Sequence, residues 1–465
     1  MDQDVNVMAA EIIERKVEKE FSTISETFYM LTMPCFILLF LEMLINVLMV
    51  HNNLDGLKTT FRFPLEFVLE HGILILPVLL ASTVYSNSVV SIFTTVVLLC
   101  FTFLLWNVLD NKNKASINDL IILPVANQQV YITYFRSIVL IFSGMVILAV
   151  DFNFFPHRFT KTETVGYSVM DAGVGLFIVS NAIVSRFPNH EENIVKVAKS
   201  IFPLLILGIG RYVSVIICDY HVNVKEYGTH WNFFITLAVV KLASFVIFKL
   251  SNFKVLNVFF ISSSLLIIHQ YLLNYGVRDW VFREIEREDF IVANREGIVS
   301  ALGYEILYLF GILLKQYFPL KDQAYSIIDM LSTLFPMSIV FMMLHLYFDG
   351  VDPISRRVIN ASYIFWILIL ASAMLLICLV IEIFNKIIFN KELKEKFRIS
   401  LLLEAVNHNS LFYFLICNLF TGFVNMSMDT SKVNVLNSFV IVFSYVCFVN
   451  LIICILFVNN IKLRL

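Results

Sequence analysis

The chain has 465 residues, of which 59% are hydrophobic and only 15% are charged. A water-soluble domain does not need so apolar a composition to fill its core, and the mean hydropathy of +0.81 places the chain among membrane proteins. The formal net charge of -2 gives no indication of a nucleic-acid partner, so we expect none.

The chain begins with a polar segment, residues 1–27, which lacks the apolar stretch of a cleavable signal peptide. We therefore expect the first apolar segment to act as an uncleaved signal anchor. The seven cysteines lie mostly within apolar segments and show no CxxC pair or metal-ligand spacing. We predict no metal site and no bound cofactor.

Apolar segments long enough to cross a membrane recur along the rest of the chain. A helix needs about 20 apolar residues to cross a hydrocarbon core roughly 30 Å thick. Thirteen candidate spans lie near residues 28–50, 71–87, 88–109, 131–150, 165–186, 197–217, 232–250, 255–275, 298–315, 325–347, 359–386, 410–428 and 436–458. The second and third nearly touch, so one longer or re-entrant element is an alternative there.

These spans predict an all-α polytopic integral membrane protein with about 13 transmembrane helices. We expect one multi-pass transmembrane domain over residues 28–458 and a short basic tail over 459–465, because no polar connection is long enough for an independent soluble fold. Neither side of the membrane has a clear excess of Lys and Arg in its loops. The small bias favours a cytoplasmic C-terminus and a luminal N-terminus.

Three polar connections fall on one side of the membrane in this topology. The first, residues 151–164, starts with Asp151 at the end of an apolar segment and continues through Pro156, Arg158 and Lys161. An acid beside cations can act as a general base whose proton uptake those neighbours tune. The alternative is a solvated interfacial loop in which Arg158 and Lys161 reach toward lipid headgroups.

The second connection, residues 218–234, contains Glu226, Tyr227, His230 and Asn232. Glu226 and His230 are four residues apart, as one face of a helix requires. Histidine is the usual proton carrier near neutral pH, so the pair is a candidate site. Tyrosine and tryptophan are also ordinary anchors at a membrane interface, and that explanation stays open.

Two further charged positions lie within or beside the spans. Arg211 stands inside the sixth span, where a guanidinium costs several kcal/mol unless it is paired, and either Asp171 in the preceding span or a phosphate is a plausible partner. In the third connection, Arg295 and Glu296 open a helix that also holds Glu305. A purely structural Asp–Arg pair is the alternative for Asp171 and Arg211.

Several separated blocks of the sequence together resemble the GPI-anchor inositol acyltransferase family, the PIG-W type enzymes. The resemblance covers roughly residues 130–460. The blocks are ILAVDFNFFPHRFTKTETVGYSVMDAGVG from Ile147, RYVSVIICDYHVNVKEYGTHWNFFITL from Arg211, NREGIVSALGYEILYLFG from Asn294, PISRRVINASYIFWILIL from Pro353 and LLEAVNHNSLFYFLICNLFTGFVNMSMDT from Leu402.

The resemblance implies transfer of a fatty acyl group, typically palmitoyl, from acyl-CoA to the inositol 2-hydroxyl of glucosaminyl-phosphatidylinositol in the endoplasmic reticulum membrane. Asp151 and Lys161 match the family's acid and lysine that are thought to be catalytic. The candidates for substrate binding are the remaining polar residues of these segments: Arg158, Asp171, Arg211, Glu226, Tyr227, His230, Asn232 and Arg295.

The sequence departs from the family pattern at three places. Ile216 stands where the family usually has a lysine, and Asn223 stands where it usually has a histidine. The N-terminal quarter of the chain matches the family poorly. The roles of the family's lysine at position 216 and histidine at position 223 therefore cannot be assumed for this chain.

Two interpretations from other classes remain open. A lipid or solute transporter would use Asp151, Asp171, Arg211 and Glu305 as an ion pathway, although no inverted repeat or broken helix pair supports one. A subunit that scaffolds a membrane complex would use the polar loops as docking faces. The sequence does not indicate an oligomeric state.

Overall fold

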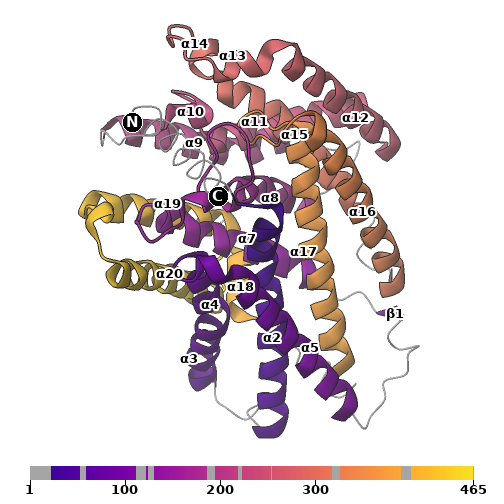
Figure 1. The fold of residues 1–465 in the computed structure, drawn as a ribbon, viewed down its shortest axis with the longest axis vertical. Coiled ribbons are helices and arrows are strands. Elements are labelled where there is room, and N and C mark those ends of the chain that lie inside the picture. The colour runs from indigo at the N-terminus through magenta and orange to yellow at the C-terminus, as the bar shows by residue number, and fades with distance from the viewer. Residues whose placement is uncertain are drawn as a thin grey trace, which may run out of the picture.

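A computed structural model describes residues 22–52, 59–110, 122–123, 130–185, 194–217, 223–252, 254–316, 325–388 and 400–463. Of the predicted polar N-terminal segment, residues 1–21 lie outside these ranges. Helices dominate the described chain (Figure 1).

The helices range in length from the 4-residue α10 to the 29-residue α2. They are α2 (Ile24–Asn52), α3 (Thr59–Glu70), α4 (Leu76–Ser82), α5 (Val89–Asp110), α7 (Val130–Ala149), α8 (Val169–Val184), α9 (Ile194–Ile217), α10 (Val224–Tyr227), α11 (Phe233–Leu250), α12 (Val255–Leu272), α13 (Arg278–Phe282), α14 (Phe290–Ala293), α15 (Arg295–Lys315), α16 (Ile327–Val351), α17 (Ala361–Ile388), α18 (Leu401–His408), α19 (Ser410–Ser427) and α20 (Val435–Val458). Two short strands, β1 (Ile122–Leu123) and β2 (Tyr325–Ser326), pair antiparallel.

The thirteen predicted spans each coincide with a helical segment. In the described residues, 12 helices are long and apolar enough to cross a membrane, and the remaining predicted span is the 16-residue α8. The all-α polytopic class is therefore confirmed. The second and third spans are separate elements, because a turn at residues 83–85 divides Phe63–Ser82 from Ser86–Trp106, which begins with a 3₁₀ helix at Ser86–Ser88.

The helices divide into an interior set and a peripheral set. In α7, 83% of the residues in its most apolar 18-residue segment are buried within the protein. In α15 and α17 the share of buried residues is 78%. In α5 and α16 the corresponding share is only 11%, although these helices are also apolar enough to span a membrane. Their exposed apolar side chains therefore face the lipid, as expected for a protein whose solvent is hydrocarbon.

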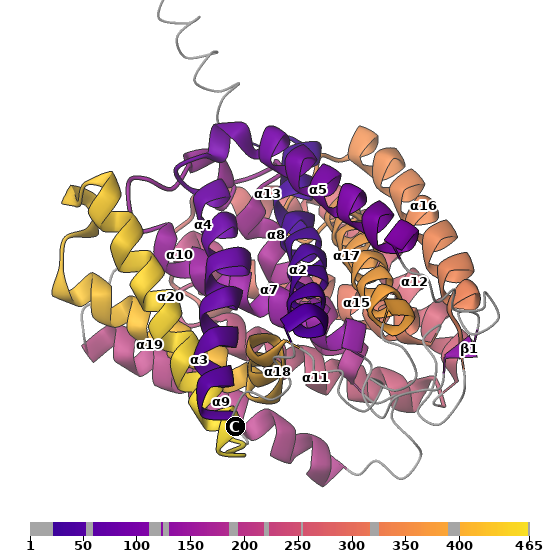
Figure 2. The same ribbon diagram turned by 90° about the horizontal axis from the view of Figure 1, so that it is seen from below.

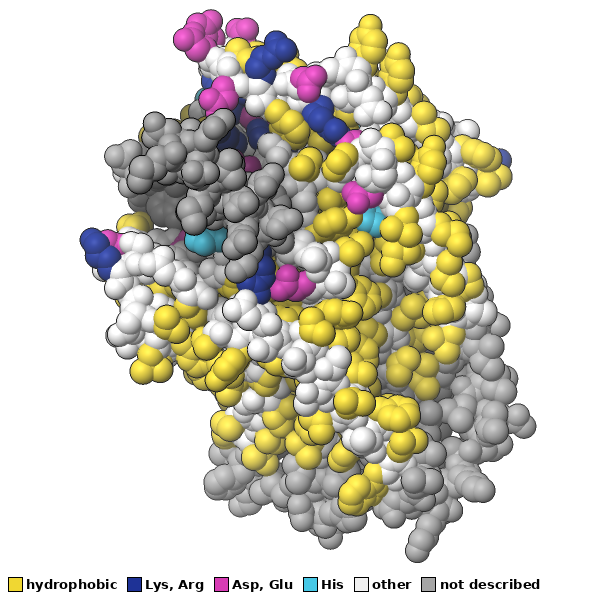
Figure 3. All heavy atoms as spheres, viewed as in Figure 1, with side chains coloured by type: hydrophobic (Ala, Val, Ile, Leu, Met, Phe, Trp, Pro, Cys, Tyr) yellow, Lys and Arg dark blue, Asp and Glu magenta, His cyan; other side chains and the backbone are white. Residues whose placement is uncertain are grey.

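The views from two directions agree with this division. The long α16 lies along α17 at one flank, whereas α19 and α20 lie on the opposite flank (Figures 1 and 2). Hydrophobic side chains cover the flank that carries α12 and α16, whereas Lys, Arg, Asp and Glu gather at the upper end of the view near α13 and α14 (Figure 3). On this face the charged side chains thus lie mainly in the upper half of the view.

Backbone contacts bring four polar connections together. The α7–α8 loop (150–168) hydrogen-bonds with the α16–α17 loop (352–360), since Gly166 N–H donates to Ile354 O at 3.0 Å. The connection around α10 joins the segment before α15, since Thr229 N–H donates to Ala293 O at 2.9 Å. The Lys161–Glu226 ion pair joins these two pairs of segments, so the three polar connections lie together and the α16–α17 loop is a fourth member.

Candidate functional site

Asp151 stands directly after α7, at the start of the α7–α8 loop. Its side chain is half-buried, and its Oδ2 accepts a hydrogen bond from the Asn425 amide of α19 at 2.8 Å. Burial raises the pKa of Asp151 above its ordinary value, while the Asn425 hydrogen bond and the charge of Lys161 offset part of that rise. A carboxylate with a raised pKa is a stronger base.

Lys161 lies in the same loop and points toward α10. Its Nζ forms an ion pair with Oε1 of Glu226 at 2.5 Å. Burial would raise the pKa of Glu226, but the charges of Lys161 and Arg356 more than offset it, so the pKa of Glu226 lies below its ordinary value. Glu226 is therefore an anion. Because an ammonium group has three N–H donors, two remain for another acceptor.

Asp171 and Arg356 form a second ion pair beside the first. Arg356 Nε lies 2.7 Å from Asp171 Oδ1, and Arg356 Nη1 lies 3.7 Å from Glu226 Oε1. Asp171 in α8 is 1% exposed and Arg356 is 4% exposed. The α8 N-terminus is fixed locally because Ser168 caps it, accepting hydrogen bonds from the N–H groups of Met170 and Asp171.

The predicted pairing of Asp171 with Arg211 was wrong, because Asp171 pairs with Arg356. Arg211 is exposed on α9 and forms no ion pair with any described residue, although its charge contributes to lowering the pKa of Glu226. It therefore lies near the site without being neutralised by Asp171. The phosphate that we considered as its other partner remains a prediction.

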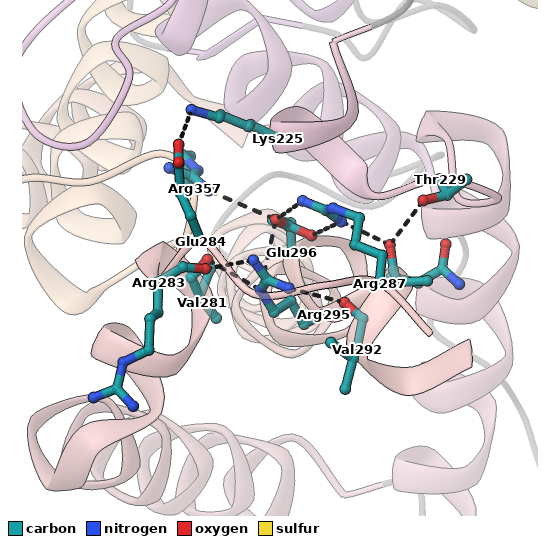
Figure 4. A network of polar contacts seen from close by, with 12 residues as sticks. Lys225, Thr229, Val281, Arg283, Glu284, Arg287, Val292, Arg295, Glu296 and Arg357 are labelled. Carbon is teal, nitrogen blue, oxygen red and sulfur yellow. Dashed lines mark hydrogen bonds and ion pairs between the residues drawn. The ribbon is translucent and has the colours of Figure 1, made fainter. Parts of the chain in front are cut away.

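A third cluster surrounds the fully buried carboxylate of Glu296 (Figure 4). Arg287 binds Glu296 through two nitrogens, at 2.6 and 3.0 Å. Arg357 and Arg295 lie 3.7 and 3.8 Å from the same carboxylate. Arg357 also donates to Glu163 O at 3.1 Å, so this cluster contacts the α7–α8 loop.

Arg295 was expected to bind substrate, and the structure shows it occupied by protein groups. Its nitrogens donate to the carbonyl oxygens of Val281 at 3.3 Å, Val292 at 3.2 Å and Arg283 at 2.6 Å. Carbonyls at a helix end are favourable partners for a cation. The contacts give Arg295 a structural role, and its role toward substrate stays a prediction.

The expected helical pair of Glu226 and His230 was wrong. Helix α10 ends at Tyr227, because Gly228 adopts φ 108°, where a Cβ would lie 2.6 Å from the Asn294 Cα. After this turn His230 is exposed and its backbone N–H donates to Asn294 Oδ1 at 2.8 Å. The imidazole contacts the Asn294 amide at 3.3 Å and stacks with the Phe290 ring.

Three other candidates lie around these clusters. Asn232 caps α11 by accepting from Phe234 and Ile235, and its amide donates to Gly208 O of α9 at 2.8 Å. Arg158 pairs with Glu26 of α2 at 3.0 Å. Tyr227 is buried, and burial raises its pKa well above the ordinary value, so it stays a neutral phenol.

The residues invoked for an ion pathway do not form one continuous group. Glu305 lies within α15 and accepts a hydrogen bond from Ser244 of α11 at 2.8 Å. By contrast, Lys161 acts electrostatically on Asp151, Asp171 and Glu226. The carboxyl groups of Asp151, Asp171 and Glu226 therefore all interact with Lys161, and the residues invoked for an ion pathway do not line a path.

Arg356 and Arg357 were missed as site residues. Their sequence appears as an ordinary basic loop, RR between two spans. It counted toward the charge bias and lies in the PISRRVINASYIFWILIL block of the resemblance, but neither arginine was named as a candidate. Both are less than 9% exposed in the structure. The signal that could have found them is their place in the block from Pro353, one of those that carry the family resemblance.

The fold and the site define a polytopic membrane protein with a buried acid–base cluster built from loops of separate helices. Comparison with known proteins then gives the family. The chain belongs to the GWT1 family, whose model matches residues 17–456.

Named relatives cover most of the chain. It is 31% identical over 419 residues to GPI-anchored wall transfer protein 1 of Yarrowia lipolytica, covering 84% of this chain and 87% of the relative. It is 31% identical over 435 residues to the mouse glucosaminyl-phosphatidylinositol-acyltransferase PIGW, covering 82% and 85%. The GPI-anchored wall transfer protein 1 of Saccharomyces cerevisiae is 30% identical, with 86% and 89% covered. These matches confirm the predicted family and the enzyme class, an acyltransferase.

Proposed function

We propose that this protein transfers a fatty acyl group, typically palmitoyl, from acyl-CoA to the inositol 2-hydroxyl of glucosaminyl-phosphatidylinositol. The name of the mouse relative supports the acceptor and the reaction. Acyl-CoA is a co-substrate in this proposal and not a bound cofactor. The participation of the family in GPI-anchor synthesis supports a location in the endoplasmic reticulum membrane, where the lipid acceptor would diffuse to the protein.

One observation supports the assignment of roles most directly: the ammonium group of Lys161 acts electrostatically on the Asp151 carboxyl, whose pKa is raised by burial. In the proposed reaction, Asp151 removes the proton from the inositol hydroxyl as its oxygen bonds to the thioester carbonyl carbon. Lys161 stabilises the negative charge that develops on the carbonyl oxygen, using N–H donors not bound to Glu226.

Collapse of the tetrahedral intermediate completes the reaction. The carbon–sulfur bond breaks, the thiolate of coenzyme A leaves, and the proton held by Asp151 passes to that sulfur. The products are the acyl ester of inositol and free coenzyme A, and the carboxylate is regenerated. The step needs no oxidant, reductant or metal.

The test uses membranes that contain this protein and lack any other inositol acyltransferase. They are given glucosaminyl-phosphatidylinositol and labelled acyl-CoA, and the acylated lipid is measured. We expect Asp151→Asn to lower the rate by about 10²–10⁴-fold, the usual contribution of a general base. The control is Glu305→Gln, a buried carboxyl away from Lys161. Full transfer by Asp151→Asn, or no acylated lipid from the unaltered protein, would refute the proposal.

A further inference from the structure

The Asp171 carboxylate fixes the backbone next to Lys161. Its Oδ2 accepts hydrogen bonds from the N–H of Thr162 at 3.1 Å and from the Thr162 hydroxyl at 2.6 Å. Thr162 follows Lys161 directly in the sequence. Movement of Asp171 would therefore change the direction in which the Lys161 side chain leaves the loop.

Glu226 fixes the other end of Lys161, its ammonium group. The same oxygen, Glu226 Oε1, lies 2.5 Å from Lys161 Nζ and 3.7 Å from Arg356 Nη1. Arg356 reaches Asp171 through a different nitrogen, Nε, at 2.7 Å. The Arg356 guanidinium thus lies between two carboxylates. Asp171 holds the backbone next to Lys161, and Glu226 holds the Lys161 ammonium group.

The loop that carries Arg356 is itself fixed against the Lys161 loop. Ser355 Oγ donates to Thr164 O at 2.5 Å, and the Ser355 N–H donates to Asn360 Oδ1 of its own loop at 3.1 Å. Burial alone would lower the pKa of Arg356, but the carboxylates of Asp171 and Glu226 more than offset it and raise that pKa. Arg356 is therefore a permanent cation in a fixed place.

We propose that Arg356 is a positioning residue for Lys161, acting through Asp171 on the backbone and through Glu226 on the ammonium group. The catalytic consequence rests on the proposed function, whereas the positioning itself does not. Lysine cannot replace arginine in this role, because a single ammonium lacks the extended planar guanidinium whose separated nitrogens lie within ion-pair distance of both carboxylates.

The first experiment measures the position of Lys161 without using activity. The purified full-length protein is treated with an amine-reactive reagent, and the modification rate of each lysine is measured by mass spectrometry. The exposed Lys225 serves as the internal reference. We expect Lys161 to react several-fold faster in Arg356→Lys and Arg356→Gln, because Asp171, and with it the backbone next to Lys161, is no longer held in place relative to Glu226.

The matched control is Arg278→Gln, which removes another ion pair to the α16–α17 loop, that with Asp352. We expect it to leave the reactivity of Lys161 unchanged. Since Arg356→Lys retains the positive charge, it is the variant more certain to fold. Equal reactivity of Lys161 in the unaltered protein and in Arg356→Lys would overturn the proposal.

The second experiment measures the pH dependence of acyl transfer. A displaced Lys161 no longer lowers the pKa of Asp151, so the rise of kcat/KM with pH should occur at higher pH in Arg356→Lys. We expect kcat to fall by about 10²-fold, the cost of a misplaced group. A lower kcat with an unchanged pH profile indicates only structural loss and overturns the proposal. If the unaltered protein transfers no acyl group, the proposed function fails, and Lys161 reactivity alone decides the positioning.

Discussion

Asn425 of α19 donates its amide N–H to Asp151 at 2.8 Å, although the two residues are 274 positions apart in the sequence. The contact ties the C-terminal helices to the loop that carries the proposed base. Because this hydrogen bond stabilises the carboxylate form, it lowers the pKa of Asp151 against the larger effect of burial.

Asn425→Leu is expected to move the pH dependence of acyl transfer. Without the amide donor the pKa of Asp151 rises further, so the base becomes active only at higher pH. Below its pKa Asp151 is protonated and inactive, so the acidic side of the kcat/KM profile should shift upward. The profile of initial rates against pH measures the shift.

The control for this prediction is Asn418→Leu in the same helix. The Asn418 amide donates to Phe414 O, a carbonyl of its own helix, at 2.7 Å. We expect Asn418→Leu to leave the pH profile in place. Identical shifts in the two variants would show that the helix as a whole, rather than the Asn425 hydrogen bond, acts on Asp151.

The Glu296 cluster gives a prediction about stability. Glu296→Gln removes the only carboxylate among the described residues that pairs with Arg287, Arg295 and Arg357. It leaves these three cations near one another, with Arg295 and Arg357 buried. Loss of one partner from a buried ion pair costs about 3–5 kcal/mol. We expect a lower midpoint in thermal unfolding of the detergent-solubilised protein.

Glu284→Gln is the comparison for Glu296→Gln. Glu284 pairs with Lys225 at 2.7 Å, but its side chain is 82% exposed. An exposed ion pair is screened by solvent, so the midpoint should not change. A Glu296→Gln protein that is as stable as Glu284→Gln would show that hydrogen bonds to carbonyl oxygens are enough to stabilise the three arginine cations.

The helices could be predicted well from the sequence because membrane insertion depends on local hydropathy. Each predicted span contains an observed helix, and even the short α8 was found, since apolar length follows directly from consecutive residues. The error at Glu226 and His230 has a backbone cause. Gly228 at φ 108° ends α10, and the close approach of Asn294 that requires this turn is not visible in the local sequence.

The site was predicted in part. Residue type and position indicated the candidates Asp151, Lys161, Asp171 and Glu226, but not which of them meet, because their contacts join separate loops. Lys161 and Glu226 are 65 positions apart, and the partner of Asp171 lies in a loop far along the chain. Arg356 was missed because its burial follows from tertiary packing and not from residue type.

The packing between the α10 region and α15 gives a further prediction. A Cβ at Gly297 would lie 2.4 Å from Trp231 Cγ and 2.6 Å from the Tyr227 carbonyl oxygen. Because the second contact is with a backbone oxygen, no change of side-chain rotamer at Tyr227 can relieve it. Gly297→Ala should therefore displace α10, and with it Glu226, at a cost of about 1–3 kcal/mol.

Gly210→Ala separates this steric effect from the general effect of replacing glycine in a helix. A Cβ added at Gly210 in α9 would meet nothing within 4 Å, so alanine there should be neutral or stabilising by up to about 1 kcal/mol. Thermal unfolding compares the two variants, and lysine modification shows whether Lys161 becomes more reactive in Gly297→Ala. If α10 moves as expected, Gly297→Ala loses both stability and the protection of Lys161. Retention of both would mean that Trp231 and the Tyr227 carbonyl can shift without disturbing the Lys161–Glu226 ion pair.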